Sequence, residues 1–174
     1  MSVLLIGLRA SGKSTIGRLL AKEIDLPLVD LDTLALQCFE QDTITEVWDR
    51  NGEAAWRDAE TLMLRQVLSG PDSVIALGGG VPMIDEARAM MQAAKDSGEA
   101  VVIYLKCDPR ELRRRLDADR GDRPPLMGAD SIDEIEVILQ QREATYEALA
   151  SHILDVTDQT AQQATDALAR WLMG

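Results

Sequence analysis

Residues 7–15 read GLRASGKST, and this stretch decides the fold. It matches the pattern G-x-x-x-x-G-K-[ST], and it lies between an apolar run at residues 2–6 and a segment, residues 13–24, with apolar residues at helical spacing. Between a strand and a helix, the pattern is typical of a loop that surrounds a phosphate chain with backbone N–H groups. The sequence therefore predicts a nucleoside-triphosphate site near the start of the chain.

Each residue type in this loop has a physical reason. Gly7 and Gly12 permit backbone conformations that turn successive N–H groups inward. Lys13 can reach the β- and γ-phosphates, and the Ser14 hydroxyl is placed to ligate Mg²⁺, the expected cofactor. The alternative, a chance glycine-rich loop, is disfavoured by the strand and helix on either side. The predicted ATP-binding residues of the loop are Gly7, Ala10, Ser11, Gly12, Lys13, Ser14 and Thr15.

Apolar runs alternate with helical patterns along the rest of the chain. The alternation predicts an α/β fold: a P-loop kinase domain with a five-stranded parallel sheet flanked by helices on both faces. A length of 174 residues suits a single domain, residues 1–174. Strands are expected at residues 2–7, 26–32, 73–77, 100–107 and 152–156, and helical segments at 13–24, 33–69, 85–98, 108–119, 132–151 and 159–173.

One segment, residues 117–131, has loop composition within a helical context. A mobile lid over about residues 117–128 is the functional interpretation, and an ordinary connecting loop is the alternative. Composition does not decide between them.

The charge balance excludes some classes of partner. Thirty acidic and 18 basic side chains give a formal net charge of −12, which disfavours nucleic acid as a partner. No apolar run approaches the roughly 20 residues of a membrane span, and no targeting segment is evident, so the expected location is the cytoplasm. Cys38 and Cys107 have no metal-type spacing and are expected to be buried free thiols. Six arginines cluster within residues 110–123, which suggests a local anion site.

Two carboxylates follow the second predicted strand, in VDLD at residues 29–32. Strand periodicity is expected to place Asp30 and Asp32 on one face, at the sheet edge where ligands bind in parallel α/β folds. The alternative for Asp32 is to cap the following helix. Asp108 also follows an apolar strand, but it is better explained as a helix cap.

The run SVIAL at residues 73–77 predicts a buried strand, and it ends in Gly78, Gly79 and Gly80. A tight turn into the next helix would account for the glycines, and so would close approach of a ligand. Arg57, three residues before Glu60, and the distant Arg142 are each typical of a surface salt bridge when taken alone.

Taken together, these motifs resemble the shikimate kinase family over essentially the whole chain. The phosphate loop alone would be unspecific, but six motifs occur in the order of the family. They are GLRASGKST, VDLD, NGEAAWRDAE at residues 51–60, IALGGGV at 75–81, RPPL at 123–126 and REATY at 142–146.

The resemblance implies transfer of the γ-phosphoryl group of ATP to the 3-hydroxyl of shikimate, with ATP and shikimate as the substrates of a monomer. It implies that Arg57 and Arg142 hold the shikimate carboxylate and that Glu60 orients Arg57. Asp32 would lie beside the attacking hydroxyl, and a helical region at about residues 33–62 would bind shikimate. The implied shikimate-binding residues are Asp32, Arg57, Gly78, Gly79, Gly80 and Arg142.

It further implies that Arg123 is a lid arginine that reaches the transferring phosphoryl group and also binds ATP. Arg115 would pack on adenine, opposite residues near Thr157. The implied catalytic residues are Lys13, Asp32 and Arg123, and the implied metal site is Ser14 with Asp30, the latter through water.

Three residues depart from the family pattern: Ala10 stands where glycine is frequent, Pro125 where leucine is usual, and Trp56 where phenylalanine is commoner. None of them removes a catalytic group, and Trp56 is expected to preserve packing as an apolar exchange. Tyr146 and the single histidine, His152, are interpreted as structural residues.

Two other functions stay open. A kinase of similar build for another hydroxy acid, such as gluconate, would share the phosphate loop. A nucleotide-dependent sensor would keep the fold without turnover. The triple glycine and the WRDAE motif favour shikimate over gluconate, and the intact charged residues argue against a sensor.

Overall fold

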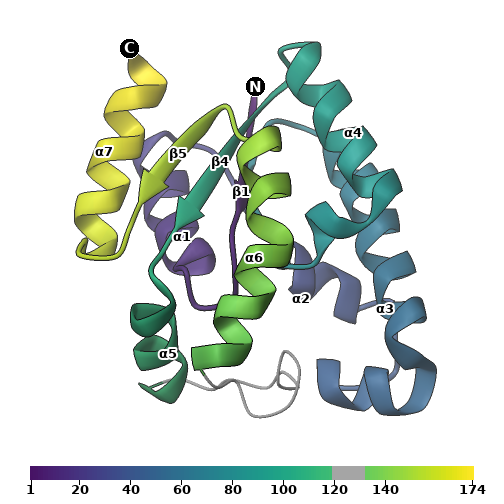
Figure 1. Cartoon of the computed structure of the whole chain (residues 1–174). Coiled ribbons are helices and arrows are strands. Elements are labelled where there is room, and N and C mark those ends of the chain that lie inside the picture. The colour runs from purple at the N-terminus through teal and green to yellow at the C-terminus, as the bar shows by residue number, and fades with distance from the viewer. Residues whose placement is uncertain (119–131) are drawn as a thin grey trace.

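The computed structural model describes residues 1–118 and 132–174 (Figure 1). These residues contain a five-stranded sheet in the order β2-β3-β1-β4-β5, and every neighbouring pair is parallel. The predicted α/β fold is therefore confirmed. The strands are β1 (Ser2–Ile6), β2 (Leu28–Asp30), β3 (Val74–Ala76), β4 (Ala100–Lys106) and β5 (His152–Asp155).

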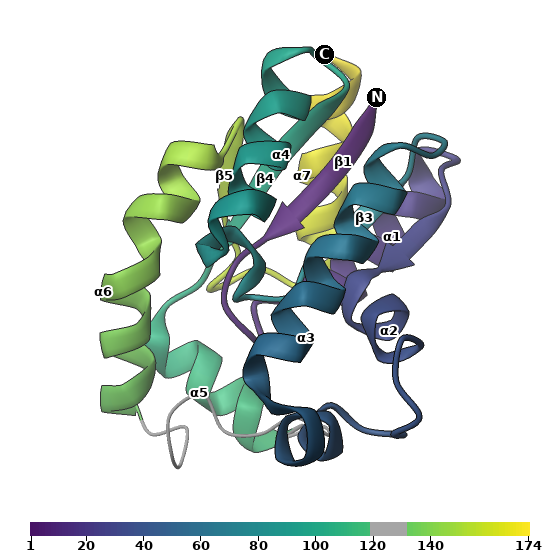
Figure 2. The same cartoon turned by 90° about the vertical axis from the view of Figure 1, so that its right-hand side faces the viewer.

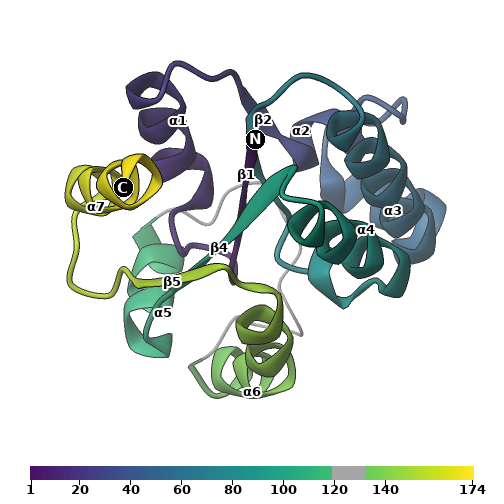
Figure 3. The ribbon, with the colours of Figure 1, turned by 90° about the horizontal axis from the view of Figure 1, so that it is seen from above.

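Helices cover both faces of this sheet. Helices α1 and α7 lie on one face, and α3, α4 and α6 lie on the other (Figure 3). The helices are α1 (Lys13–Glu23), α2 (Leu31–Leu36), α3 (Ile44–Leu68), α4 (Asp85–Asp96), α5 (Pro109–Ala118), α6 (Ile132–Leu149) and α7 (Ala161–Met173), with a 3₁₀ turn η1 (Val81–Met83) before α4.

Strand β1 shows why the first apolar run is continuous rather than alternating. Val3 and Leu5 pack into the core on one face of the sheet, and Leu4 and Ile6 pack into the core on the other. A central parallel strand is buried on both sides, so it needs apolar residues at every position.

The register of β1 against its neighbours positions the ligand-binding edge. Leu5 pairs with Ala76 of β3 and with Ile103 of β4, so the carboxyl ends of these strands lie together. This is the lower edge of the sheet in Figure 1, where α5 and the loops after the strands gather. Ligands of open parallel sheets bind at this edge.

A separate small apolar cluster joins α2 to α3. The two helices lie side by side in Figure 2. The fully buried residues of the cluster are Ala35, Val47, Trp56 and Ala59. Because this cluster is distinct from the two large ones, the α2–α3 region forms its own packing unit beside the sheet edge.

The structure corrects the prediction for residues 26–69. Strand β2 ends at Asp30, and Asp32 lies in the first turn of α2, so the idea that strand periodicity places both carboxylates is wrong. The reason is local: the Asp30 carboxylate accepts the Thr33 N–H at 3.2 Å and so caps a helix directly after the strand. The predicted helical region at residues 33–69 contains two helices, α2 and α3, and α3 is interrupted at Gly52.

Two smaller expectations are also settled. Cys107 is buried as predicted, whereas Cys38 is exposed, so the prediction for Cys38 is wrong. Asp108 accepts the Arg110 N–H at 2.8 Å, which agrees with a helix cap. Among residues 1–118 and 132–174, no helix is long and apolar enough to cross a membrane.

Candidate functional site

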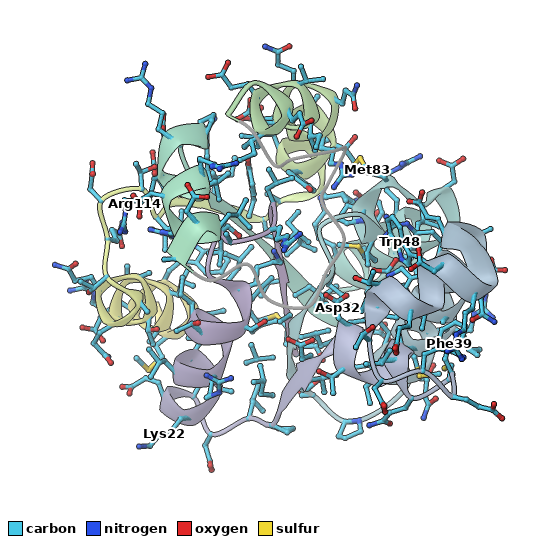
Figure 4. The ribbon with its side chains drawn as sticks, turned by 90° about the horizontal axis from the view of Figure 1, so that it is seen from below. Lys22, Asp32, Phe39, Trp48, Met83 and Arg114 are labelled. Atoms are coloured by element: carbon cyan, nitrogen blue, oxygen red, sulfur yellow. The ribbon has the colours of Figure 1, made fainter. Side chains whose placement is uncertain are left out.

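A cavity of about 700 Å³ opens at the carboxyl edge of the sheet. Figure 4 looks onto this edge, with Asp32 near the middle, Arg114 on the α5 side and Trp48 on the α3 side. The predicted site residues that line the cavity are Ala10, Gly12, Lys13, Ser14, Thr15, Asp30, Asp32 and Arg115.

The loop between β1 and α1 has the strained backbone that its sequence predicts. Gly7 and Gly12 have φ of 144° and 99°. Ala10 has a φ of 66°, in the left-handed region, where an alanine costs about 1–3 kcal/mol relative to glycine. The Ser11 hydroxyl is buried and has no hydrogen-bond partner among the described residues. A buried orphan hydroxyl in such a loop is consistent with a ligand that supplies the missing partner.

Lys13, the first residue of α1, turns back over this loop. Its Nζ donates to the carbonyl oxygens of Gly7 at 3.0 Å and Leu8 at 2.9 Å, and the residue is only 8% exposed. A buried ammonium group needs acceptors, and the loop carbonyls provide them here. Lys13 also lines the cavity, where its ammonium group could bind a phosphate.

Ser14 and Asp30 meet at the floor of the cavity. The Ser14 hydroxyl donates to Asp30 Oδ2 at 2.7 Å. A hydroxyl and a carboxylate are hard oxygen donors, which suit Mg²⁺, and both line the space beside Lys13. The residues therefore fit a magnesium ion bound with a nucleotide.

The opposite wall of the cavity comes from α5 and the segment after β5. Arg115 donates through Nη2 to the Val156 carbonyl at 2.8 Å and through Nε to Glu111 at 2.7 Å. Hydrogen bonds from Arg114 and Arg115 lower the pKa of Glu111 to about 2. Arg115 and Thr157 both line the cavity.

The glycine turn after β3 lies beside this cavity, and each glycine meets a different neighbour. A Cβ on Gly78 would clash with Glu60 and lie 2.7 Å from Asp32 Oδ1. A Cβ on Gly79 would lie 3.2 Å from the Gly7 carbonyl. None of the three glycines has a left-handed φ, so space, and not backbone conformation, requires them.

Arg57 is held beside Gly80 by several groups of α3. Its Nη1 donates to Glu60 Oε2 at 2.7 Å, and its Nη2 donates to Glu53 Oε1 at 2.9 Å. The centre of the guanidinium lies 5.6 Å from the centroid of the Trp48 ring, which is cation–π contact. A Cβ on Gly80 would lie 2.5–2.8 Å from the guanidinium atoms. The glycine therefore makes room for Arg57.

Glu60 links Arg57 to Asp32. It is 1% exposed, and burial raises the pKa of its carboxyl group to about 7, against the opposing effect of Arg57. The nearby Asp32 carboxylate raises this pKa further, and a hydrogen bond from Trp56 lowers it. Trp56 is thus more than an apolar exchange, because a phenylalanine has no N–H to donate.

Helix α6 brings two donors to the same turn. Arg142 Nη1 donates to the Gly79 carbonyl at 3.2 Å, and the Tyr146 hydroxyl donates to the same oxygen at 2.6 Å. Tyr146, interpreted from the sequence as a structural residue, therefore contacts the glycine turn. The signal that could have found it is its spacing, since residues four apart lie on one face of a helix.

The structure therefore brings most of the predicted residues into two adjoining groups. The nucleotide group lines the cavity, and the second group gathers Arg57, Arg142 and Asp32 around the glycine turn. Asp32 belongs to both groups. Arg123 and most of the predicted lid lie outside the described residues.

A parallel sheet in this order with a phosphate loop after its central strand defines a P-loop kinase fold. The chain belongs to the shikimate kinase family, whose family model, described as "Shikimate kinase", matches residues 9–173. "Shikimate kinase 2" of Yersinia pestis (strain Pestoides F) is 36% identical over 99% of this chain and 96% of the relative. "Shikimate kinase" of Bradyrhizobium diazoefficiens is 39% identical over 83% of this chain and 67% of the relative.

Solved structures agree with this assignment. Shikimate kinase from Bacteroides thetaiotaomicron superposes with a TM-score of 0.85 at 27% identity, over 100% of this chain and 99% of that chain. Shikimate kinase from Acinetobacter baumannii, in complex with shikimate, superposes with a TM-score of 0.89 at 23% identity, over 99% and 92% of the two chains, and this likeness concerns the fold.

Proposed function

We propose that this chain transfers the γ-phosphoryl group of ATP to the 3-hydroxyl of shikimate, giving shikimate 3-phosphate and ADP. The observation that carries the proposal is the position of Arg57 and Arg142. They approach one glycine turn from two different helices, and Asp32 joins that turn to the nucleotide cavity. A small acceptor with a carboxylate at one end and hydroxyls at the other matches this arrangement.

The arginine pair would bind the carboxylate. A guanidinium group offers paired N–H donors whose geometry matches a carboxylate, and it stays charged at all physiological pH values. Glu60 and Glu53 fix the direction of Arg57, so part of the orientation cost is met before the acceptor binds.

Asp32 would accept a hydrogen bond from the attacking hydroxyl and direct it towards the γ-phosphate. Phosphoryl transfer has a loose transition state with charge spread over the phosphoryl oxygens, so positioning and positive charge dominate catalysis. Lys13 would exchange its loop carbonyls for phosphate oxygens. Arg123 is proposed to add a further positive charge, on the basis of the family resemblance.

Ser14 and Asp30 would hold Mg²⁺ with the nucleotide, Asp30 through a water molecule. When bound, the ion neutralises charge on the β- and γ-phosphates. A monomeric state and a cytoplasmic location are part of this proposal.

The first experiment is an ADP-release assay with MgATP and shikimate, gluconate or no acceptor. We expect release with shikimate only. Release with gluconate would assign Arg57, Arg142 and Asp32 around the glycine turn, here called the acceptor group, to another hydroxy acid. ATP binding without any release would favour a nucleotide sensor.

Arg57→Ala tests the acceptor group directly. Loss of a charged hydrogen-bonding partner costs about 1.5–3 kcal/mol, so the KM for shikimate should rise about 10- to 100-fold while the KM for ATP stays nearly unchanged. Arg65→Ala is the matched control, because Arg65 lies on the same helix and is 55% exposed in a surface pair with Glu86. Equal effects of Arg57→Ala on both substrates would refute this role.

A further inference from the structure

The Gly79 carbonyl is held by two donors from one face of α6. The Tyr146 hydroxyl donates at 2.6 Å, and Arg142 donates at 3.2 Å. Tyr146 is fully buried, and its ring packs against Tyr104 with centroids 5.1 Å apart. Burial raises the pKa of Tyr146, so its hydroxyl stays protonated and can donate this hydrogen bond.

The same peptide region touches the phosphate loop. A Cβ on Gly79 would lie 3.2 Å from the Gly7 carbonyl and 3.5 Å from the Arg9 nitrogen. Gly79 is therefore wedged between the nucleotide loop on one side and α6 on the other.

Arg142 has two tasks. Its Nη1 donates to the Gly79 carbonyl, and the proposed function requires the same guanidinium to turn to a carboxylate. A buried carbonyl oxygen left without a hydrogen-bond donor costs free energy. If Arg142 were the only donor to the Gly79 carbonyl, moving it away would carry this cost. The shorter hydrogen bond from the Tyr146 hydroxyl removes this cost, because it keeps the carbonyl paired.

We propose that Tyr146 is a positioning residue that keeps the Gly79 carbonyl satisfied, so that Arg142 can turn to the acceptor carboxylate while the glycine turn stays against the phosphate loop. This inference rests on the proposed function. It assigns to the hydroxyl of Tyr146, and not to its ring, a role in acceptor affinity.

Tyr146→Phe tests the role, with Tyr104→Phe as the matched control. Both substitutions remove one buried hydroxyl from the same ring pair, but the Tyr104 hydroxyl has no hydrogen-bond partner among the described residues. We expect Tyr146→Phe to raise the shikimate Kd, measured calorimetrically without ATP, about tenfold. We expect Tyr104→Phe to leave it unchanged, and both variants to keep the ATP affinity of the wild type.

A double-mutant cycle separates this role from a general effect on structure. If Tyr146 acts by releasing Arg142, Tyr146→Phe should have little further effect on shikimate affinity in the Arg142→Ala background. Additive effects would overturn the proposal, as would unchanged affinity in Tyr146→Phe or loss of its folded circular-dichroism spectrum. A wild-type enzyme that neither binds nor phosphorylates shikimate would instead refute the proposed function.

Discussion

At the scale of single residues, the three glycines of the turn are explained by what surrounds them. The sequence left open a tight turn or close approach of a ligand, and the structure shows that protein groups use space around each glycine. Glu60 and Asp32 lie at Gly78, the phosphate loop lies at Gly79, and Arg57 lies at Gly80. The turn therefore packs against several parts of the protein and is also a candidate binding surface. In addition, Gly78–Val81 forms a hydrogen-bonded turn that leads into η1.

Gly80→Ala should therefore act through Arg57. The added methyl group would lie 2.5–2.8 Å from the guanidinium atoms and would push them out of position. We expect the KM for shikimate to rise at least tenfold with the KM for ATP little changed, as measured by ADP release. Gly70→Ala is a suitable control at an exposed position, where the nearest atom is a backbone oxygen 3.3 Å away. An unchanged shikimate KM in Gly80→Ala would show that Arg57 does not need this space.

Glu60 gives the fold a pH dependence whose sign follows from its environment. Burial raises the pKa of this carboxyl group to about 7 in the folded chain, from 4.5. The stabilisation from this group is therefore fully present below about pH 4.5 and is lost as the pH rises through about 7. The corresponding free energy is about 3 kcal/mol at most.

Glu60→Gln should remove this dependence. At pH 5 the Glu60 carboxyl is protonated and carries no charge to pair with Arg57, whereas at pH 8 it is ionised, so the prediction concerns the pH profile and not the absolute stability. Urea unfolding at pH 5 and pH 8 should show the wild type losing more stability than the variant between these values. Parallel profiles for the two proteins would contradict the raised pKa of Glu60.

At the scale of elements, the break in α3 shapes the acceptor group. Gly52 has φ 83° and ψ 161°, so the helix stops and restarts there. Trp48 lies before the break, and Glu53 and Arg57 lie after it, yet all three meet at the guanidinium. The break thus allows one helical segment to place an aromatic ring over an arginine of the next.

Gly52→Ala should disturb this arrangement through the backbone alone, because an added Cβ would meet nothing within 4 Å. A non-glycine residue in such a conformation costs about 1–3 kcal/mol. We expect both lower thermal stability and a higher shikimate KM. Gly98→Ala is the matched control: its φ is 77°, its Cβ would also meet nothing within 4 Å, and it lies after α4, away from the acceptor group. It should lower the stability but leave the KM unchanged.

At the scale of the whole molecule, the parallel sheet aligns segments that are distant in sequence. The phosphate loop follows β1 and the glycine turn follows β3, and these two strands are neighbours in the sheet. Arg57 comes from α3 and Arg142 from α6, which pack on the same face of the sheet. The nucleotide group and the acceptor group are therefore adjacent because β1 and β3 are neighbours in the sheet.

The sequence by itself determined the fold class, the five strands and the phosphate loop. These features depend on local spacing: continuous apolar runs, helical periodicity, and glycines at fixed distances from Lys13. Their physical causes act within about ten residues, so a single stretch such as residues 7–15 carries the information. The motif resemblance extended this to the acceptor arginines.

The support of the acceptor group becomes evident only in the packed structure. Asp32 reaches the site from a helix and not from a strand, Tyr146 shares the Gly79 carbonyl with Arg142, and Trp56 contributes to the charge balance of Glu60. These roles arise from burial and from contacts between helices separated by many residues. The spacing of Arg142 and Tyr146 indicates a shared helix face, but burial, hydrogen-bond partners and the space around a glycine exist only once the chain has packed.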